Sequence, residues 1–332
     1  MLIETPAGLY CAAGGFHIDP WGAAPRALIT HAHGDHARPG SAAYLCAAPC
    51  APLLTRRLAP APIETLAYGE RLTLGDTTVS FHPTGHVLGS AQIRIEGSDG
   101  VWVVSGDYTR APDPTCTAFE PLRCDVFVTE STFALPIYHW DPAGDVIRDV
   151  RTWWQQNGDA GLTSIVFCYT IGKAQRLLAE LAAATDRPVL VHGMLVFAIE
   201  VYRRAGIRML PTQPLLERPR GTSLAGELVL APLSARGTPW MRRLGPLSDG
   251  LASGLMRVRG VRRQRAYDRG FVLSDHADWP ALLDTIAATG ASRVLVTHGH
   301  AATLARYLRE RGTDAGVLRT AWEGEAGADE SE

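Results

Sequence analysis

The stretch His31-Ala32-His33-Gly34-Asp35-His36 directly follows the apolar run Ala27–Thr30 and holds four metal-capable side chains within six residues. On a loop that leaves a buried strand, His31 and His33 can converge on one cation. Asp35 and His36 start one turn later and can reach a second cation. An isolated histidine is usually an ordinary surface or core residue, whereas three histidines and an aspartate at this density indicate ligands. The stretch therefore predicts a site for two metal ions.

Further ligands are available at the ends of other strand-like runs. His86 follows the run Thr77–Pro83, and Asp107 follows the run Val101–Val104. Two cations held roughly 3.5 to 4 Å apart usually share a bridging carboxylate. Each residue alone could be a loop or turn residue, but their common position after strands favours ligands. Asp19, at the end of another short run, either orients a ligating histidine from behind or opens a turn.

Composition places the chain among ordinary globular proteins with room for two packed units. Of its 332 residues, 46% are hydrophobic and 20% are charged. No apolar run approaches the roughly 18 residues of a membrane span, and the first residues do not resemble a secretion signal. The six cysteines form no Cys-x-x-Cys pair. We therefore expect a cytoplasmic protein with reduced thiols and no membrane partner.

The net charge of −2 is unevenly distributed. Five acidic and no basic residues lie in the segment 323–332, which predicts a solvated acidic tail. The rest of the chain then has a net charge of about +3, because five negative charges are removed from −2. Net charge by itself therefore neither indicates nor excludes a polyanionic partner.

The pattern of predicted elements changes near residue 141. Before it, short strand-like runs are separated by Gly, Pro and Asp turn signals. After it, helices and strands alternate, which predicts a parallel sheet with covering helices. The expected helices are 141–156, 173–184, 196–205, 278–289 and 302–312, and the strands between them are 164–169, 188–192, 227–232, 270–273 and 293–297.

This arrangement resembles the metallo-β-lactamase fold in its nucleic-acid-processing branch, the β-CASP nucleases, over nearly the whole chain. The HxHxDH signature of the family matches the stretch 31–36, and its next histidine and bridging aspartate match His86 and Asp107. The acidic residue and the histidine that define the branch match Glu130 and His276, and its last position matches His298. The stretches 172–175, 257–269 and 274–279 look most like the bacterial ligase-associated DNA damage response exonucleases.

The resemblance implies an α/β fold in two parts. Residues 1–134 and 266–332 would form a metallo-β-lactamase αβ/βα sandwich, and residues 135–265 an inserted β-CASP α/β cap. Almost 150 residues separate Glu130 from His276, an insertion that small-molecule hydrolases of this fold do not need. A cap over the metals would select an extended strand, which favours a nucleic-acid substrate.

The resemblance also implies a ligand set and a mechanism. One cation would be held by His31, His33, His86 and Asp107, and the other by Asp35, His36, Asp107 and His298. The catalytic positions would be Asp35, Glu130 and His276. A hydroxide activated by the two metals would attack phosphorus, and His276, held by Glu130, would protonate the departing oxygen. Zinc fits these nitrogen and oxygen ligands, with manganese as the alternative.

The function expected from the resemblance is that of a metal-dependent DNA exonuclease in repair. Its substrate would be single-stranded or end-exposed DNA, and a DNA ligase and a helicase of the same system would be partners. His298 supports a first alternative, an RNA-processing β-CASP ribonuclease, because RNA-processing members have His at this position. A second alternative is a non-catalytic nucleic-acid-binding subunit, which the intact ligand set opposes. A small-molecule hydrolase is disfavoured by the insertion.

Several basic and aromatic residues are candidates for contacts with nucleic acid. Six arginines lie within 13 residues just before His276, and such a ribbon can neutralise phosphates; a solvated edge strand is the other interpretation. Lys173 starts a helix where a phosphate could bind, and an ordinary helix start explains it equally well. Tyr169 and Trp240 could stack on bases or pack in the core. The six arginines are Arg257, Arg259, Arg262, Arg263, Arg265 and Arg269.

Overall fold

The computed structural model describes residues 1–319, except for the side chain of Arg262. The chain divides into two compact units, which are described separately below. Within the described residues, unit 1 consists of Met1–Pro136 together with 275–319, and unit 2 is Ile137–Ser274. The acidic tail predicted at 323–332 lies outside the described residues.

The first sheet of unit 1 has six strands in sequence order. Strands β1, β2 and β3 pair antiparallel, and β3 to β6 pair parallel. Helix α1 (Ala51–Leu58) lies between β5 and β6 along the chain and contacts β6. The strands are β1 (Leu2–Thr5), β2 (Gly8–Cys11), β3 (Phe16–Ile18), β4 (Ala27–Ile29), β5 (Tyr44–Ala47) and β6 (Ile63–Leu66).

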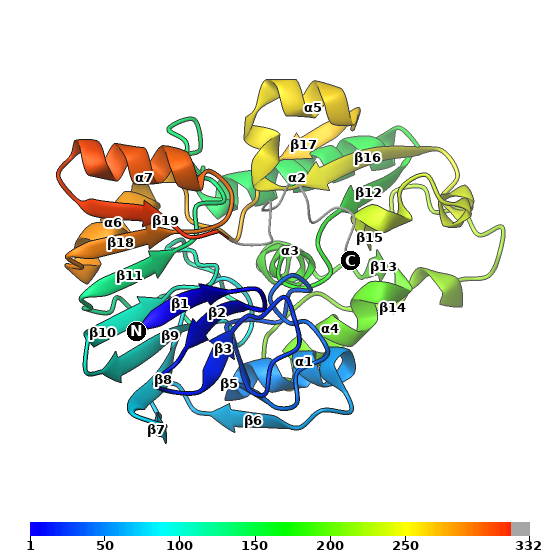
Figure 1. Ribbon diagram of the computed structural model, residues 1–332. Coiled ribbons are helices and arrows are strands. Elements are labelled where there is room, and N and C mark those ends of the chain that lie inside the picture. The colour runs from blue at the N-terminus through cyan, green and yellow to red at the C-terminus, as the bar shows by residue number, and fades with distance from the viewer. Residues whose placement is uncertain (320–332) are drawn as a thin grey trace. The chain divides into compact units, whose positions relative to one another are not determined.

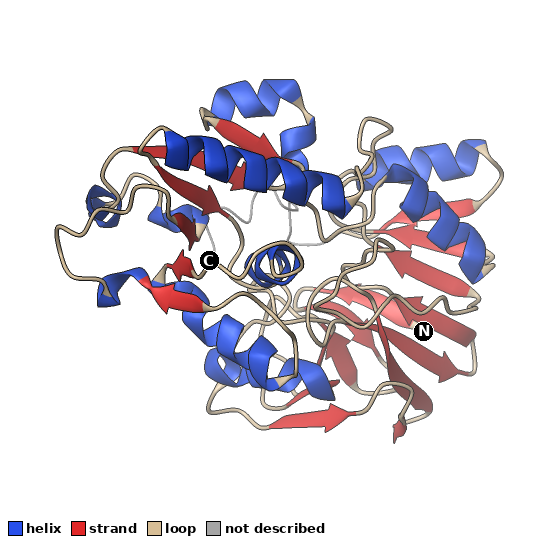
Figure 2. Cartoon of the chain, turned by 180° about the vertical axis from the view of Figure 1, so that it is seen from behind, coloured by secondary structure: helices blue, strands red, loops and turns tan. Residues whose placement is uncertain are grey.

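The second sheet of unit 1 has seven strands in the order β19-β18-β11-β10-β9-β8-β7. One face packs on the first sheet through buried side chains such as Leu28, Phe81 and Ile93. The other face is covered by α6 (Trp279–Thr289) and α7 (Ala301–Glu310), as Figure 2 shows. The strands are β7 (Arg71–Leu74), β8 (Thr77–Pro83), β9 (Ala91–Gly97), β10 (Gly100–Val104), β11 (Val126–Thr129), β18 (Arg293–Val296) and β19 (Asp314–Val317).

Strand direction in this second sheet brings distant residues to one edge. Strands β10, β11 and β18 are parallel to one another. Strand β8 runs in the same direction, because β8 and β10 are both antiparallel to β9. The segments that follow β8, β10, β11 and β18 therefore leave the sheet on the same side. His86, Asp107, Glu130 and His298 lie in these segments, one to three residues after the end of their strands.

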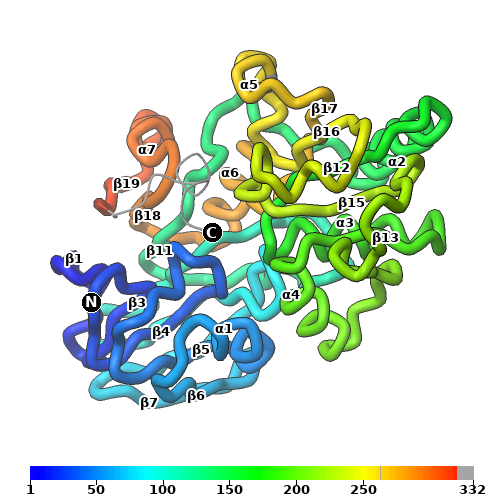
Figure 3. Tube along the Cα trace, turned by 90° about the vertical axis from the view of Figure 1, so that its right-hand side faces the viewer, coloured from blue at the N-terminus to red at the C-terminus, as the bar shows by residue number. Residues whose placement is uncertain are grey.

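Unit 2 has one parallel sheet in the order β14-β13-β15-β12-β16-β17 (Figures 1 and 3). One face packs on α2, α3 and α4, and the other packs mainly on loops and short 3₁₀ turns. The strands are β12 (Thr163–Phe167), β13 (Val189–Val191), β14 (Thr212–Pro214), β15 (Leu228–Ala231), β16 (Leu247–Ala252) and β17 (Arg269–Phe271). The helices are α2 (Ala143–Asp159), α3 (Lys173–Leu181), α4 (Gly193–Arg204) and α5 (Arg259–Arg265). The 3₁₀ turns among the described residues of both units are η1 (Ala48–Cys50), η2 (Leu215–Glu217), η3 (Leu233–Ala235), η4 (Pro239–Arg243) and η5 (Gly254–Arg257).

The prediction of an α/β fold is confirmed by these sheets and their covering helices. The unit boundaries lie at 136/137 and 274/275, where the sequence predicted 134/135 and 265/266. The second boundary lies later because β17 (Arg269–Phe271) pairs with β16 and so belongs to unit 2. Within the described residues the six cysteines are free thiols, and no helix has the length and apolar character needed to cross a membrane.

Candidate metal centre

Asp19 fixes the loop that holds the histidine cluster. Its Oδ1 accepts a hydrogen bond from the backbone N of Thr30 at 2.8 Å, and its Oδ2 accepts one from Thr30 Oγ1 at 2.5 Å. The same Oδ2 lies 2.8 Å from His36 Nδ1. Asp19 therefore contacts both the start and the end of the loop, and it leaves His36 Nε2 free to face the site.

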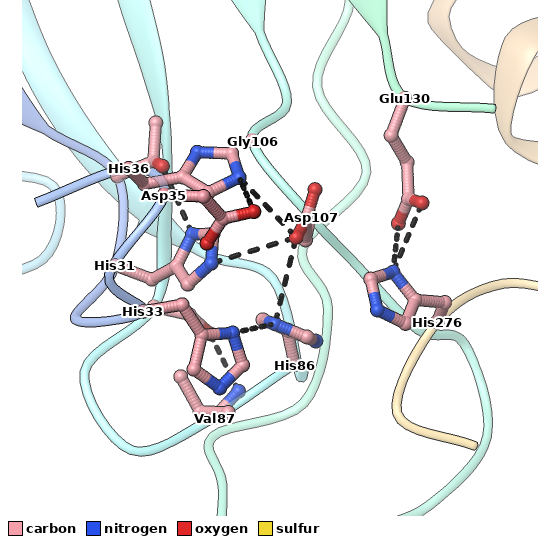
Figure 4. Close-up of polar contacts among 12 residues, drawn as sticks. His31, His33, Asp35, His36, His86, Val87, Gly106, Asp107, Glu130 and His276 are labelled. Atoms are coloured by element: carbon pink, nitrogen blue, oxygen red, sulfur yellow. Dashed lines mark hydrogen bonds and ion pairs between the residues drawn. The ribbon is translucent and has the colours of Figure 1, made fainter. Parts of the chain in front are cut away.

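Four predicted ligands from both sheets of unit 1 meet at one point. The donor atoms of His31, His33, His86 and Asp107 all lie within 4.8 Å of one another. Asp107 Oδ2 lies 3.5 Å from His31 Nε2 and 3.7 Å from His86 Nε2, and His33 Nδ1 lies 3.1 Å from His86 Nε2 (Figure 4). His31 follows β4 of the first sheet, whereas His86 and Asp107 follow strands of the second.

A second group shares His31 with the first. The donor atoms of His31, Asp35 and His36 also lie within 4.8 Å of one another. His36 Nε2 lies 3.4 Å from Asp107 Oδ2 and 3.8 Å from Asp35 Oδ2. His298 belongs to neither group: its ring stacks on that of His36 with 5.1 Å between centroids. Asp107 Oδ2 thus lies within 3.7 Å of histidine nitrogens from both groups, and its role as a bridge stays a prediction.

The chemistry of these donors fits divalent cations. Buried polar atoms in proteins are normally hydrogen-bonded. Yet His31 Nε2, His36 Nε2, Asp107 Oδ1 and both ring nitrogens of His298 are buried with no hydrogen-bond partner among the described residues. Imidazole nitrogens and carboxylate oxygens are the ligands that zinc and manganese accept. The residues present therefore fit two metal ions.

Electrostatics in the site favour the ligating forms of several side chains. Burial lowers the pKa of His86 to about 3, and burial together with the nearby His36 lowers the pKa of His31 well below its usual value. Both rings are therefore neutral, as a ligand must be. Burial disfavours the charge of Asp107, but His36, with His31 and His276, outweighs burial and holds the pKa of Asp107 well below its usual range. Burial likewise opposes the charge of His36, which Asp107 and Asp35 overcome, so that the pKa of His36 is raised.

Glu130 and His276 form a buried pair beside Asp107. His276 Nδ1 lies 3.0 Å from Glu130 Oε2 and 3.2 Å from Oε1, and Oε1 also accepts a hydrogen bond from the backbone N of Tyr108 at 2.8 Å. The donors of Asp107, Glu130 and His276 lie within 4.8 Å of one another. Burial opposes the charge of His276, but the Glu130 carboxylate, with smaller effects of Asp107 and Asp275, outweighs burial and raises the pKa of His276 to about 10.

Asp275 is a site residue to which the sequence reasoning gave no role. Its backbone oxygen lies 2.9 Å from His86 Nδ1, which leaves His86 Nε2 to face Asp107. Its carboxylate Oδ1 lies 3.8 Å from His276 Nε2, and the side chain is buried. The only signal in the sequence was its position directly before His276.

The predicted basic ribbon is mostly helical. Residues Arg259–Arg265 form α5, so the interpretation of this stretch as an edge strand is wrong; only Arg269 lies in such a strand, β17. Arg257 pairs with Asp141 at 2.9 Å, and Arg269 lies 3.7 Å from Asp149. Arg259 and Arg263 are exposed, Arg265 is half-buried, and the side chain of Arg262 lies outside the described part of the chain.

Lys173 starts α3 as expected, but its side chain is only 2% exposed. Its Nζ lies 4.2 Å from the centre of the Tyr169 ring, a cation–π contact. Tyr169 itself is buried, and Trp240 packs at the edge of the core of unit 2. The aromatic residues therefore pack in or against the core.

Comparison with known proteins supports a relation to nucleases. The chain is 32% identical over 325 residues to a probable DNA ligase of Opitutus terrae; the match covers 95% of this chain and 31% of that protein. It is 29% identical over 118 residues to cleavage and polyadenylation specificity factor 73 of Drosophila melanogaster, covering 35% of this chain and 17% of that protein. It is 33% identical over 76 residues to endoribonuclease ysh1 of Emericella nidulans, covering 22% of this chain and 9% of that protein. No family model matches the chain.

A solved structure shares the fold. A protein of unknown function from Enterococcus faecalis superposes with a TM-score of 0.60 at 14% identity, covering 90% of this chain and 80% of that one. The chain spans less than a third of the length of the probable DNA ligase, the specificity factor and the endoribonuclease. The homologues support the resemblance to β-CASP nucleases, and they do not distinguish DNA from RNA as substrate.

Proposed function

We propose that this chain is a metal-dependent phosphodiesterase of the β-CASP type, acting as a DNA exonuclease in repair. In this proposal unit 1 is the metallo-β-lactamase domain and unit 2 is the β-CASP domain. The observation that supports it most is that Asp107 lies close to histidines of both ligand groups, directly beside the Glu130–His276 pair. Two adjacent cations with an acid–base pair at their side suit phosphodiester hydrolysis.

The proposed ligand set is the one that the resemblance implies. His31, His33, His86 and Asp107 would hold one cation, and Asp35, His36, Asp107 and His298 the other. When bound, zinc or manganese would lower the pKa of water and offset negative charge on a phosphate group. Asp19 positions His36 through its Nδ1, so that Nε2 is the nitrogen that faces the site.

The remaining chemistry belongs to Glu130 and His276. The Glu130 carboxylate holds the proton on His276 Nδ1 and keeps the ring positively charged at neutral pH. His276 can then donate a proton from Nε2 to the oxygen that leaves phosphorus, as a general acid. Asp275, 3.8 Å from that nitrogen, would stabilise the charged ring. Asp35, the third catalytic position expected from the resemblance, would act as a ligand of the second cation.

DNA is the preferred substrate in this proposal because nearly the whole chain aligns with part of a protein named a probable DNA ligase. Joining breaks and trimming strand ends are complementary steps of repair. We therefore propose a ligase as a partner, and a helicase of the same system by resemblance. An RNA nuclease is the second candidate, because relatives are named endoribonucleases and His298 lies at the position where RNA-processing members have His.

A time course on end-labelled single-stranded DNA and RNA of identical sequence, with zinc or manganese added, tests the proposal. We expect stepwise shortening of DNA from an end and slower cleavage of RNA. The matched control is Asp107→Asn, which preserves side-chain size but removes the shared charge. Cleavage of RNA alone would establish the second candidate, and equal cleavage by the Asp107→Asn variant would overturn the metal site.

A further inference from the structure

Unit 2 contains a basic pocket built from residues that the proposed metal centre does not use. The pocket has a volume of about 710 Å³ and lies where β12, β15 and β16 begin, at the amino ends of the parallel strands. None of its lining residues in the described part of the chain is acidic. It is lined by one tryptophan and four arginines, namely Trp240, Arg218, Arg220, Arg242 and Arg243.

Hydrogen bonds hold the walls of this pocket together. Thr163 Oγ1, at the start of β12, lies 3.0 Å from the backbone oxygen of Leu224 and 2.7 Å from that of Leu244. One hydroxyl thus joins a strand to the loops before β15 and β16. Arg243 Nη2 donates to the backbone oxygen of Arg218 at 2.7 Å. The loops that bear the arginines are therefore fixed before any ligand arrives.

The pocket offers hydrogen-bond donors that lack partners. Arg218 Nε and Trp240 Nε1 are buried without a hydrogen-bond acceptor among the described residues. The nearest acidic contact of Arg218 is Glu227, at 3.5 Å. Arg220 and Arg242 are exposed, and neither forms an ion pair within residues 1–319. The guanidinium groups of Arg220 and Arg242 are therefore available to an anion with several oxygens.

A second basic pocket continues the first along the same edge of the sheet. It has a volume of about 570 Å³ and is lined by Arg148, Arg151 and Arg187 together with the acidic Asp159; Arg148 also pairs with Asp145 at 2.6 Å, so Arg151 and Arg187 contribute most of its positive charge. Gly158 and Gly226 line it, and a Cβ added to Gly158 would lie 3.3 Å from the Cα of Gly226. Their near neighbours Gly161 and Ala225 line the first pocket. The two pockets are therefore adjacent, and closely packed backbone lies between them.

We propose that the two pockets together form an anion-binding track for the phosphate backbone of single-stranded nucleic acid. Arginine binds phosphate in a bidentate manner, and a row of such sites suits a polymer with regularly repeated phosphates better than a single small anion. The Trp240 ring borders the first pocket, and Arg187 lies over Trp154 at 4.6 Å beside the second. The inference depends on the proposed function only in taking nucleic acid as the substrate.

The test is a binding measurement that does not require cleavage. Arg220→Ala and Arg242→Ala are combined in one variant, and fluorescence anisotropy follows a labelled oligo(dT) of about 30 nucleotides, which exceeds typical single-strand sites of ~16. A chelator prevents turnover, and salt is varied between about 50 and 200 mM. The matched control combines Arg204→Ala and Arg208→Ala, which removes equal charge from exposed positions of unit 2 outside both pockets.

Each lost phosphate contact reduces the slope of log affinity against log salt by about 0.7 for single strands. We therefore expect a slope lower by about 1.4 in the pocket variant, and little change in the control. Equal slopes in both variants, or no binding of oligo(dT) by the unaltered chain, would overturn the track. A chain that cleaves DNA but shows equal slopes refutes this inference alone, whereas absence of cleavage with a reduced slope refutes the nuclease proposal alone.

Discussion

Replacing Glu130 by Gln should lower the pKa of His276, so that the ring is largely uncharged at neutral pH instead of positively charged. The Glu130 carboxylate, 3.0 Å from His276 Nδ1, raises the pKa of that ring from 6.5 to about 10 against the opposing effect of burial. Without the charge, we expect the pKa to fall to about 6.5 or below, because burial then acts with less opposition. A fall from about 10 to about 6.5 is about 3.5 pH units, which corresponds to about 5 kcal/mol of lost preference for the imidazolium. The Gln amide can still accept the hydrogen bond from Tyr108 N.

Histidine ring resonances followed by NMR across a pH titration of the metal-depleted protein measure this pKa directly. The matched control is Glu120→Gln, since Glu120 contacts His82 at 3.1 Å in an exposed pair of the same kind and should leave His276 unaffected. In wild type the pair stabilises the fold below pH 6.5, and this stabilisation is lost as the pH rises through about 10. If His276 in the Glu130→Gln variant still titrates near pH 10, Glu130 is not the source of the shift.

Three further changes probe the site. His276→Ala should retain metal but slow cleavage by roughly 10² to 10⁴, the range for loss of a general acid. Metal analysis checks the metal content and single-turnover kinetics check the rate. A normal rate would exclude His276 as the general acid. Asp19→Asn should weaken metal binding by about 10- to 100-fold by releasing His36, as measured by competition with a chelating dye. Combined Arg259→Ala and Arg263→Ala should flatten the salt dependence of DNA binding, and an unchanged slope would make α5 purely structural.

The positions of the candidate ligands were predictable because strand ends are recognisable in sequence. His31, His86 and Asp107 each follow an apolar run by one to three residues, and runs of the same direction end at the same edge of a sheet. The position of the His298 side chain could not be predicted in the same way. It depends on a left-handed backbone at His298, with φ of 59°, which no local sequence pattern predicts.

Other features required tertiary context. Strand β16 (Leu247–Ala252) was not predicted, since Asp249 and Gly250 are poor strand formers and only its central position in the sheet stabilises it. Strand β19 (Asp314–Val317) was missed for a similar reason, as it contains Asp and Gly. The Arg-rich stretch gave no apolar period, so its helical form could not be distinguished from a charged strand. The arginines of the proposed track lie in α2, in η4 and in the segments before β13 and β15, and no sequence motif links them.

One consequence follows from the origin of the ligands. His31 comes from the first sheet of unit 1, and His86 and Asp107 come from the second. A cation bound by these three side chains would tie both halves of the sandwich together at its rim, much as a disulfide clamps two strands. Its binding energy would then add to the cohesion of the whole unit, so the melting temperature of the protein should climb with the concentration of free zinc. The melting temperature would therefore report how much metal is bound, without any need for a substrate.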